Sequence, residues 1–262
     1  MRLARHELRQ GRTALLVWAA AISFLMAVCV LLYPEMEGDM GELGDMFSSM
    51  GSFSEAFGMD QVNFGTLEGF YAVECGNILG LGGAFYAALC AVTMLEKEER
   101  GHTAEFLLAH PISRRRILLE KLAASLAQVA LLNGAVLAVS LAALAGIGNE
   151  LPWKGILLVH LAYFLLQAEL VGVCFGISAF LRRGGMGIGL GIAAVLYFLQ
   201  IIANLSQEAG FLKYITPFGY ADGTKIVADG SLDLGLVALG MLYGLLGALA
   251  ADWEYGRKDI QG

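Results

Sequence analysis

Residues 122–147 read LAASLAQVALLNGAVLAVSLAALAGI, a run of mostly apolar residues without one charged side chain. A helix needs about 20 mainly apolar residues to cross the hydrocarbon core of a bilayer. A strand crossing a bilayer would instead alternate polar and apolar residues, which this run does not do. Because a helix satisfies its own backbone hydrogen bonds in lipid, the run predicts a membrane-spanning α-helix.

Five further stretches have the same character, so we predict an all-α membrane protein with six spans in one transmembrane domain, residues 1–262. The chain is 57% hydrophobic and only 16% charged, whereas an average soluble domain is roughly 25% charged. Counting the run above, the predicted spans are approximately 13–33, 75–95, 122–147, 155–181, 186–204 and 234–251.

The placement of basic residues predicts the orientation, because cytoplasmic segments collect Lys and Arg. Fourteen of the 17 basic residues lie before the first span, after the last, or in the second and fourth connecting segments. We therefore expect a multi-pass protein of a prokaryotic plasma membrane with both termini cytoplasmic. All charged residues of the first external segment, 34–68, are Asp or Glu. Two interpretations of this segment stay open: a solvated loop, and a loop that captures a cation or a peptide.

Two shorter segments are predicted to lie at the membrane surfaces. Arg2, Arg5 and Arg9 share one helical face before the first span, which favours an interfacial helix contacting membrane lipid over a simple charged flank. At the outer side, residues 211–220 are too aromatic for a solvated loop and predict a short inserted helix broken at Pro217. A further short helix is expected around residues 42–50.

Polar residues inside the spans are candidates for the translocation path, since such groups are costly in lipid. The alternative for each is an interhelical hydrogen bond. Glu169 shares a face with Gly172 and Gly176, a small-residue pair that lets helices approach closely, so it is expected to point toward another helix. The candidates are Asn133, His160, Gln167, Glu169, Tyr197, Gln200 and Asn204.

Several chemistries lack their motifs in this sequence. There is no Gly-rich phosphate loop ending in Lys-Ser or Lys-Thr, no His-Glu-x-x-His pair and no Gly-x-Ser-x-Gly turn. The histidines and cysteines do not cluster at metal-ligand spacing, and no basic domain is present for nucleic acid. We therefore expect no catalytic activity, no metal site and no nucleic-acid binding in this chain.

The densest charge lies in EKEERGHTAEFLLAHPISRRR, residues 96–116. Residues 103–109 can form two helical turns that Pro111 ends, and Ser113 is a suitable N-cap for a helix beginning at Arg114. The apolar residues 106–108, with charge on both sides, are typical of a surface that docks into another protein. The alternative, folding back onto the inner leaflet, is disfavoured by repulsion between the acidic residues and anionic lipid.

The run Glu-x-Glu-Glu-Arg-Gly-x-Thr-x-Glu-x-Leu-Leu-x-x-Pro-Ile-Ser-Arg, residues 96–114, resembles the cytoplasmic loop of type-2 ATP-binding-cassette (ABC) exporter permeases. Six spans, a basic N-terminal helix and Thr-Pro-Phe at 216–218 also resemble that family. One departure is the glycine, Gly101, which lies one residue earlier than in the commoner motif, so that His102 precedes the threonine.

The resemblance implies that this loop is a coupling helix that inserts into a separate cytoplasmic ABC ATPase subunit. It also implies a second copy of this chain or a similar permease, and ATP and Mg bound by the ATPase alone, so that this chain needs no cofactor. Carried onto this sequence, the docking residues are Glu98, Glu99, Arg100, Thr103, Glu105, Phe106, Leu107, Leu108, Pro111, Ser113 and Arg114.

Two other classes of function stay open on the sequence. A secondary transporter or channel could use an ion gradient through Glu169, and a membrane anchor could recruit a partner without moving a substrate. The sequence names no substrate, and it does not distinguish a homodimer from a heterodimer.

Overall fold

The computed structural model of the protein describes residues 2–36, 38, 46, 50–57, 59, 62–63, 65–101, 112–148, 152–206 and 208–257. Within these residues, six helical segments are long and apolar enough to cross a membrane. They are α2 (Arg12–Met36), α5 (Leu67–Cys75) continued by a π-helical turn η1 (Gly76–Gly80) and α6 (Leu81–Arg100), α8 (Arg114–Ile147), α9 (Trp153–Phe180), α10 (Gly185–Leu205) and α12 (Leu234–Arg257).

The fold class and the six spans are thus confirmed, but several helices extend beyond the predicted bounds, most of all at two starts. The second span begins at Leu67 rather than Cys75, and the helix of the third begins at Arg114 rather than Leu122. Hydropathy marks only the apolar part of a helix, whereas the backbone hydrogen bonds continue through polar turns at its ends. The short helix expected around residues 42–50 falls almost wholly outside the described residues.

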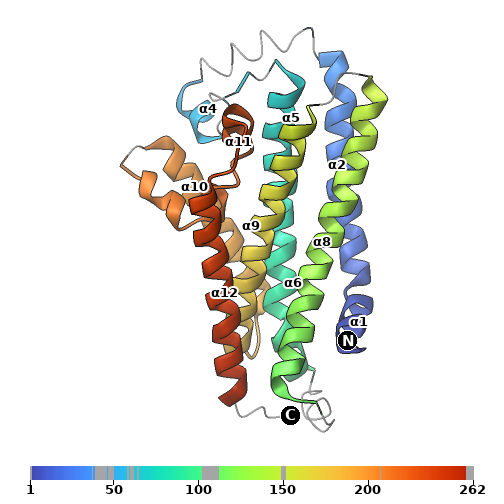
Figure 1. The fold of residues 1–262 in the computed structure, drawn as a ribbon, viewed down its shortest axis with the longest axis vertical. Helices are drawn as coiled ribbons and strands as arrows, with labels where there is room; N and C mark the ends of the chain where they lie inside the picture. Colours follow the sequence, from blue (N-terminus) through green and yellow to red (C-terminus); the bar gives the residue numbers. More distant parts are fainter. Residues whose placement is uncertain are drawn as a thin grey trace.

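The spans form an elongated bundle in which α9 is central and largely buried (Figure 1). α9 packs most extensively against α12 and α6, while α2 packs against α8, and α10 packs mainly on α6. α1 (Arg2–Gln10) lies against α8 at the end of the bundle where α12 also ends. We call this the amino-terminal end, and the end that carries α5 the opposite end.

Small residues bring α9 and α12 into backbone contact. A Cβ atom at Gly172 would collide with the backbone of Gly244, and one at Gly176 would collide with that of Gly247. Such close approach strengthens van der Waals packing between helices in lipid, where there is little hydrophobic driving force. The glycine spacing therefore predicted a real packing face.

Short elements cover the opposite end: α4 (Ser52–Ala56), two 3₁₀ helices η2 (Gly210–Tyr214) and η3 (Pro217–Gly219), and α11 (Gly223–Asp229). Pro217 begins η3, where the missing N–H costs nothing, and the side chain of Thr216 caps it. Phe218 and Tyr220 are buried, while Phe211 and Tyr214 are exposed. The predicted inserted segment is thus a chain of short helices interrupted at Pro217.

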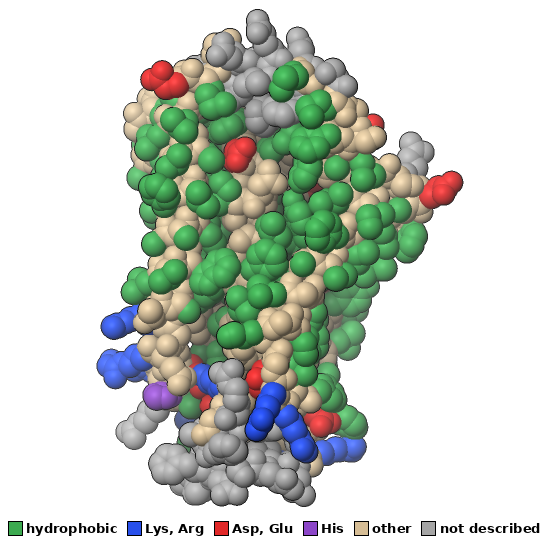
Figure 2. All heavy atoms as spheres, turned by 180° about the vertical axis from the view of Figure 1, so that it is seen from behind, with side chains coloured by type: hydrophobic (Ala, Val, Ile, Leu, Met, Phe, Trp, Pro, Cys, Tyr) green, Lys and Arg blue, Asp and Glu red, His purple; other side chains and the backbone are tan. Residues whose placement is uncertain are grey.

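The surface is apolar around the middle of the bundle and charged at one end (Figure 2). Lys and Arg side chains gather at the amino-terminal end, while large exposed apolar residues such as Leu16, Leu131, Phe198 and Leu245 lie along the spans. A soluble protein seldom exposes a continuous apolar patch of this extent, so this band is the surface that faces lipid.

Candidate functional site

Four charged side chains join three helices at the amino-terminal end. Glu7 of α1, Lys97 and Glu98 of α6 and Lys121 of α8 form what we call the basal cluster. The Lys121 ammonium lies 2.9 Å from Glu7 Oε1 and 2.6 Å from Glu98 Oε1. Lys97 makes an ion pair with the second oxygen of Glu7. Two positive and two negative charges therefore balance within the cluster.

The cluster is closed to solvent at its centre. Lys121 is 0% exposed and Glu7 is 2% exposed. Lys121 also donates to the backbone oxygen of Met94 at 2.9 Å, so all three of its donors have partners. Burying a charge is costly unless it is paired and hydrogen-bonded, and here the pairing is nearly complete.

The electrostatics of Glu7 follow from these neighbours. Burial by itself would raise the pKa of the Glu7 carboxyl, but the attraction of Lys121 and Lys97 outweighs burial, and the pKa lies below its ordinary value. Glu7 is therefore ionised at neutral pH and holds α1 against both α6 and α8.

A second contact fixes the start of α1. Glu120 of α8 accepts hydrogen bonds from the backbone N–H groups of Leu3 and Ala4 at 2.9 and 3.2 Å. These N–H groups belong to the first turn of α1, which has no intrahelical partners for them. A carboxylate there also interacts favourably with the helix dipole, so α8 supplies a cap for the start of α1.

The same end holds the two helices that flank the predicted docking loop. Ser113 caps α8 as expected, accepting from Arg116 N at 3.4 Å. Arg114 donates to the backbone oxygen of Tyr255 at 3.0 Å, which satisfies a carbonyl near the end of α12. Glu98, expected at the rim of the ATPase, is bonded within the chain to Lys121.

The remaining predicted docking residues lie beyond what the structure describes. Residues 102–111, which hold Thr103, Glu105, Phe106, Leu107, Leu108 and Pro111, are outside the described ranges, as are the side chains of Glu99 and Arg100. Their assignment to a docking surface stays a prediction.

The predicted path residues separate into three groups. In the first, Asn133 Nδ2 of α8 donates to Gln167 Oε1 of α9 at 2.7 Å and to the backbone oxygen of Val129 at 2.9 Å. Gln167 is 0% exposed. The two side chains lie in the interior between α6, α8 and α9. They form an interhelical hydrogen bond, which was the alternative to a place on the translocation path.

In the second group, buried residues of α9 bond to aromatic hydroxyls. His160 Nε2 lies 2.6 Å from the hydroxyl of Tyr71, and Glu169 Oε2 accepts from the hydroxyl of Tyr220 at 2.8 Å. A Cβ atom at Gly240 of α12 would collide with the Glu169 carboxylate. Glu169 thus points toward another helix, as its spacing from Gly172 and Gly176 predicted.

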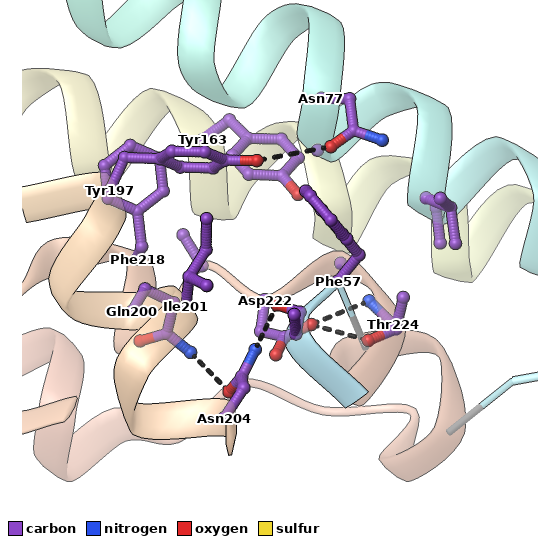
Figure 3. A pocket seen from close by; sticks show the side chains of 16 residues that line it. Phe57, Asn77, Tyr163, Tyr197, Gln200, Ile201, Asn204, Phe218, Asp222 and Thr224 are labelled. Atoms are coloured by element: carbon purple, nitrogen blue, oxygen red, sulfur yellow. Dashed lines mark hydrogen bonds between the residues drawn. The ribbon is translucent and has the colours of Figure 1, made fainter. Parts of the chain in front are cut away.

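In the third group, Tyr197, Gln200 and Asn204 of α10 line a pocket at the opposite end (Figure 3). The pocket is open to the surface and has a volume of about 60 Å³. Space for one water needs about 10–15 Å³ on a comparable measure, so several waters or a small ligand group fit. Its other walls come from α4 and Phe57, from α5 and η1, from α9 and from the start of α11.

Hydrogen bonds hold the pocket walls together while leaving the interior open. Gln200 Nε2 donates to Asn204 Oδ1 at 3.0 Å, and Asn204 Nδ2 donates to the backbone oxygen of Ala56 at 3.2 Å (Figure 3). Across the pocket, the Tyr197 hydroxyl lies 3.5 Å from Asn77 Oδ1. These bonds join α10 to α4 and to η1.

Sequence reasoning missed the carboxylate of this pocket, Asp222. Its Oδ1 accepts from Thr224 N at 3.2 Å, from Lys225 N at 3.4 Å and from Thr224 Oγ1 at 2.6 Å, and so caps α11. Its Oδ2 lies 3.3 Å from the Lys225 ammonium. The Asp-Gly-Thr sequence does signal an N-cap, but it does not indicate that the cap faces a pocket.

One more buried carboxylate links two spans. Glu96 of α6 is 1% exposed and its Oε2 accepts from the backbone N–H of Gly185 at 2.8 Å. Gly184 before it has φ of +84°, a conformation that glycine adopts at little cost. Glu96 thereby caps the start of α10, which begins close to α6.

A bundle of six candidate membrane spans, with buried ion pairs at one end and an open polar pocket at the other, defines a polytopic membrane protein. The chain belongs to the ABC-2 family: the sequence model described as ABC-2 family transporter protein matches residues 1–222. It is accordingly a membrane permease component of an ABC transporter, and permeases of this family work with an ATPase partner. No curated protein gives a significant match.

Proposed function

We propose that the chain is the membrane subunit of an ATP-driven exporter and that it couples ATP hydrolysis by a separate ATPase to efflux of a substrate. The observation that carries the proposal is membership of the ABC-2 family together with the apolar-centred loop at 102–111, which has charged residues on both sides. That loop connects α6 and α8, which the basal cluster joins to α1.

The amino-terminal end is proposed to face the cytoplasm of a prokaryotic cell, across the plasma membrane. The support is the gathering of Lys and Arg side chains at this end (Figure 2), since positive charge is retained on the cytoplasmic side during insertion. Both termini and the docking loop would then lie on the side where ATP is present.

The basal cluster gives a physical route from docking to the spans. Lys121 bonds Glu98, near the end of the helix before the loop, and Glu7, on the helix before the first span. A displacement of the loop by an ATPase would therefore move α6, α8 and α1 together. Because a buried ion pair resists separation of its partners, the three helices act as one unit.

The working assembly is proposed to contain two permease chains and two ATPases, with ATP and Mg bound by the ATPases. The second permease is another copy of this chain or a similar one. α10 offers a face for it: Gly187 and Gly191 have open space beside them, and Phe198 and Ile202 are exposed. The substrate would pass between the two permeases, and the pocket lined by Tyr197, Gln200 and Asn204 is proposed to lie at the outer end of its path.

Reconstitution tests this proposal directly. The purified chain alone is expected to hydrolyse no ATP, whereas the chain with its partner ABC ATPase is expected to hydrolyse ATP in proteoliposomes. Walker-lysine substitution in that ATPase should abolish the activity of the complex. Appreciable hydrolysis by this chain alone, or failure of the two proteins to form a complex, would contradict the proposal.

A further inference from the structure

The pocket at the opposite end has the chemical character of a site for a cation. Among the described residues that line it, Asp222 is the one with a carboxyl group, and none is a lysine or an arginine. Four aromatic side chains line it as well, Phe57, Tyr163, Tyr197 and Phe218. Aromatic faces attract ammonium groups, and an anionic ligand would instead meet a carboxylate.

The Asp222 carboxylate is held in position before any ligand arrives. Three hydrogen bonds from Thr224 and Lys225 go to Oδ1, so that this oxygen is committed to capping α11. The other oxygen, Oδ2, points to the Lys225 ammonium at 3.3 Å. Because one oxygen fixes the orientation of the group, the second can bind a cation without further loss of side-chain freedom.

Lys225 does not line the pocket, but it is paired with the Asp222 oxygen that such a cation would contact. Its ammonium lies 3.3 Å from Asp222 Oδ2 and 3.5 Å from Asn204 Oδ1, and its side chain is 41% exposed. A half-exposed ion pair at these distances is worth at most about 1 kcal/mol. A ligand ammonium can therefore displace Lys225 toward solvent at small cost.

We propose that this pocket binds a small organic ammonium group, and that Lys225 acts as an internal competitor that occupies Asp222 when no ligand is bound. The aromatic walls favour an alkylammonium over a hydrated inorganic cation, which needs several oxygen ligands. Within the described part of the chain, no three His, Cys, Asp or Glu side chains are placed to hold a metal ion. The oxygen Oε1 of Gln200, buried and without a hydrogen-bond partner, offers a further acceptor beside the pocket.

Binding of methylammonium to the purified full-length chain, measured by titration calorimetry at constant ionic strength, tests the proposal. Lys225→Met should tighten binding by about fivefold, because it removes the competing ammonium. Asp222→Asn should weaken binding by at least about tenfold, because it removes the charge from a charge-assisted hydrogen bond. Asparagine is also a good N-cap, so α11 is retained.

Two matched variants serve as controls. Asp233 caps α12 through Gly235 and Leu236, as Asp222 caps α11, but it does not line the pocket; Asp233→Asn should leave binding unchanged. Lys154→Met is the control for Lys225→Met, and it too should leave binding unchanged. Tyr197→Leu tests the aromatic wall. It should weaken methylammonium binding by a few-fold, and it should weaken potassium binding less, because the aromatic face favours an alkylammonium.

Several results would overturn the proposal. They are equal affinities for Asp222→Asn and Asp233→Asn, tighter binding of potassium than of methylammonium, or no saturable binding by either the wild-type or the Lys225→Met chain. The measurement uses the chain without an ATPase. Its failure therefore leaves the proposed permease function standing, and failure of ATPase coupling leaves this proposal standing.

Discussion

The basal cluster contains a lysine, and the pocket adjoins one, placed between carboxylate and amide or carbonyl oxygens, but the two lysines differ in exposure and in the space beside them. Lys121 is 0% exposed and has three partners within 2.9 Å. Lys225 is 41% exposed at its side chain, and its two contacts are 3.3 and 3.5 Å long. The pocket beside it holds about 60 Å³ of open space.

This difference separates a structural joint from a site that can exchange ligands. A buried network whose charges are nearly all paired fixes the geometry of its helices, and breaking it leaves an unpaired charge in a medium of low dielectric constant. A loose, half-exposed pair adjoining a cavity stabilises the fold little and can be replaced by a ligand. The first kind of site suits transmission of movement, and the second suits recognition.

The largest expected effect comes from substituting the two lysines in parallel. Lys121→Met leaves Glu98 and part of Glu7 without a cation and should destabilise the chain by about 3–5 kcal/mol. Lys225→Met, the matched change at the exposed lysine, should cost less than about 1 kcal/mol. Thermal unfolding of the two variants in the same detergent measures both values. Similar losses of stability in the two variants would contradict the distinction between a structural ion pair and an exchangeable one.

The helix pair that runs between the two regions is the next place to test. Gly172→Leu should destabilise α9–α12 packing by about 1–3 kcal/mol or more, because the side chain would collide with the backbone of Gly244. Gly187→Leu has open space beside it and should be tolerated in the isolated chain. Comparison of the unfolding temperatures checks this, and a stable Gly172→Leu variant would refute the packing described.

The pH dependence of stability should reveal the charge state of Glu7. Its pKa lies below the ordinary value of 4.5 because Lys121 and Lys97 outweigh the effect of burial. Its contribution is therefore fully present above the ordinary pKa and is lost as the pH falls through the lowered pKa. In Glu7→Gln this part of the pH dependence should vanish; an unchanged acid profile would show that Glu7 is not ionised in the native cluster.

The smallest expected effect concerns the pair Asn133 and Gln167. Their hydrogen bond joins α8 to α9, and interhelical hydrogen bonds of this kind average about 0.6 kcal/mol and seldom exceed about 2. A double-mutant cycle with Asn133→Ala and Gln167→Ala should give a coupling energy in that range. A coupling near zero would show that the hydrogen bond does not stabilise the packing of α8 on α9.

Hydropathy and spacing predicted the spans and a close-packing face on α9, because both depend on local composition; that α12 packs on this face was not predicted. The motif at 96–114 predicted the family, and Ser113 predicted the start of α8. The basal cluster was not predictable in the same way, since Glu7 and Lys121 are separated by 114 residues and nothing in their local sequence marks them as partners. Asp222 was missed because its local sequence, Asp-Gly-Thr, indicates a helix N-cap whether or not the side chain also lines a pocket.

The sequence also could not sort the polar residues of the spans. Asn133, Glu169 and Gln200 are equally unusual in lipid, yet one bonds across helices, one bonds a tyrosine and one lines a pocket. The sorting depends on which helices are neighbours, which one sequence does not specify.

The most direct test of the central claim is recovery of the ATPase with variants of the docking loop. Wild-type chain solubilised from membranes should retain its partner ABC ATPase, and so should Arg257→Asp, a charge change at the same end of the bundle. Leu107→Asp should lose the ATPase, while an unchanged unfolding temperature should show that the chain is still folded. Undiminished recovery of the ATPase by Leu107→Asp would contradict the account, because docking would then not depend on residues 106–108.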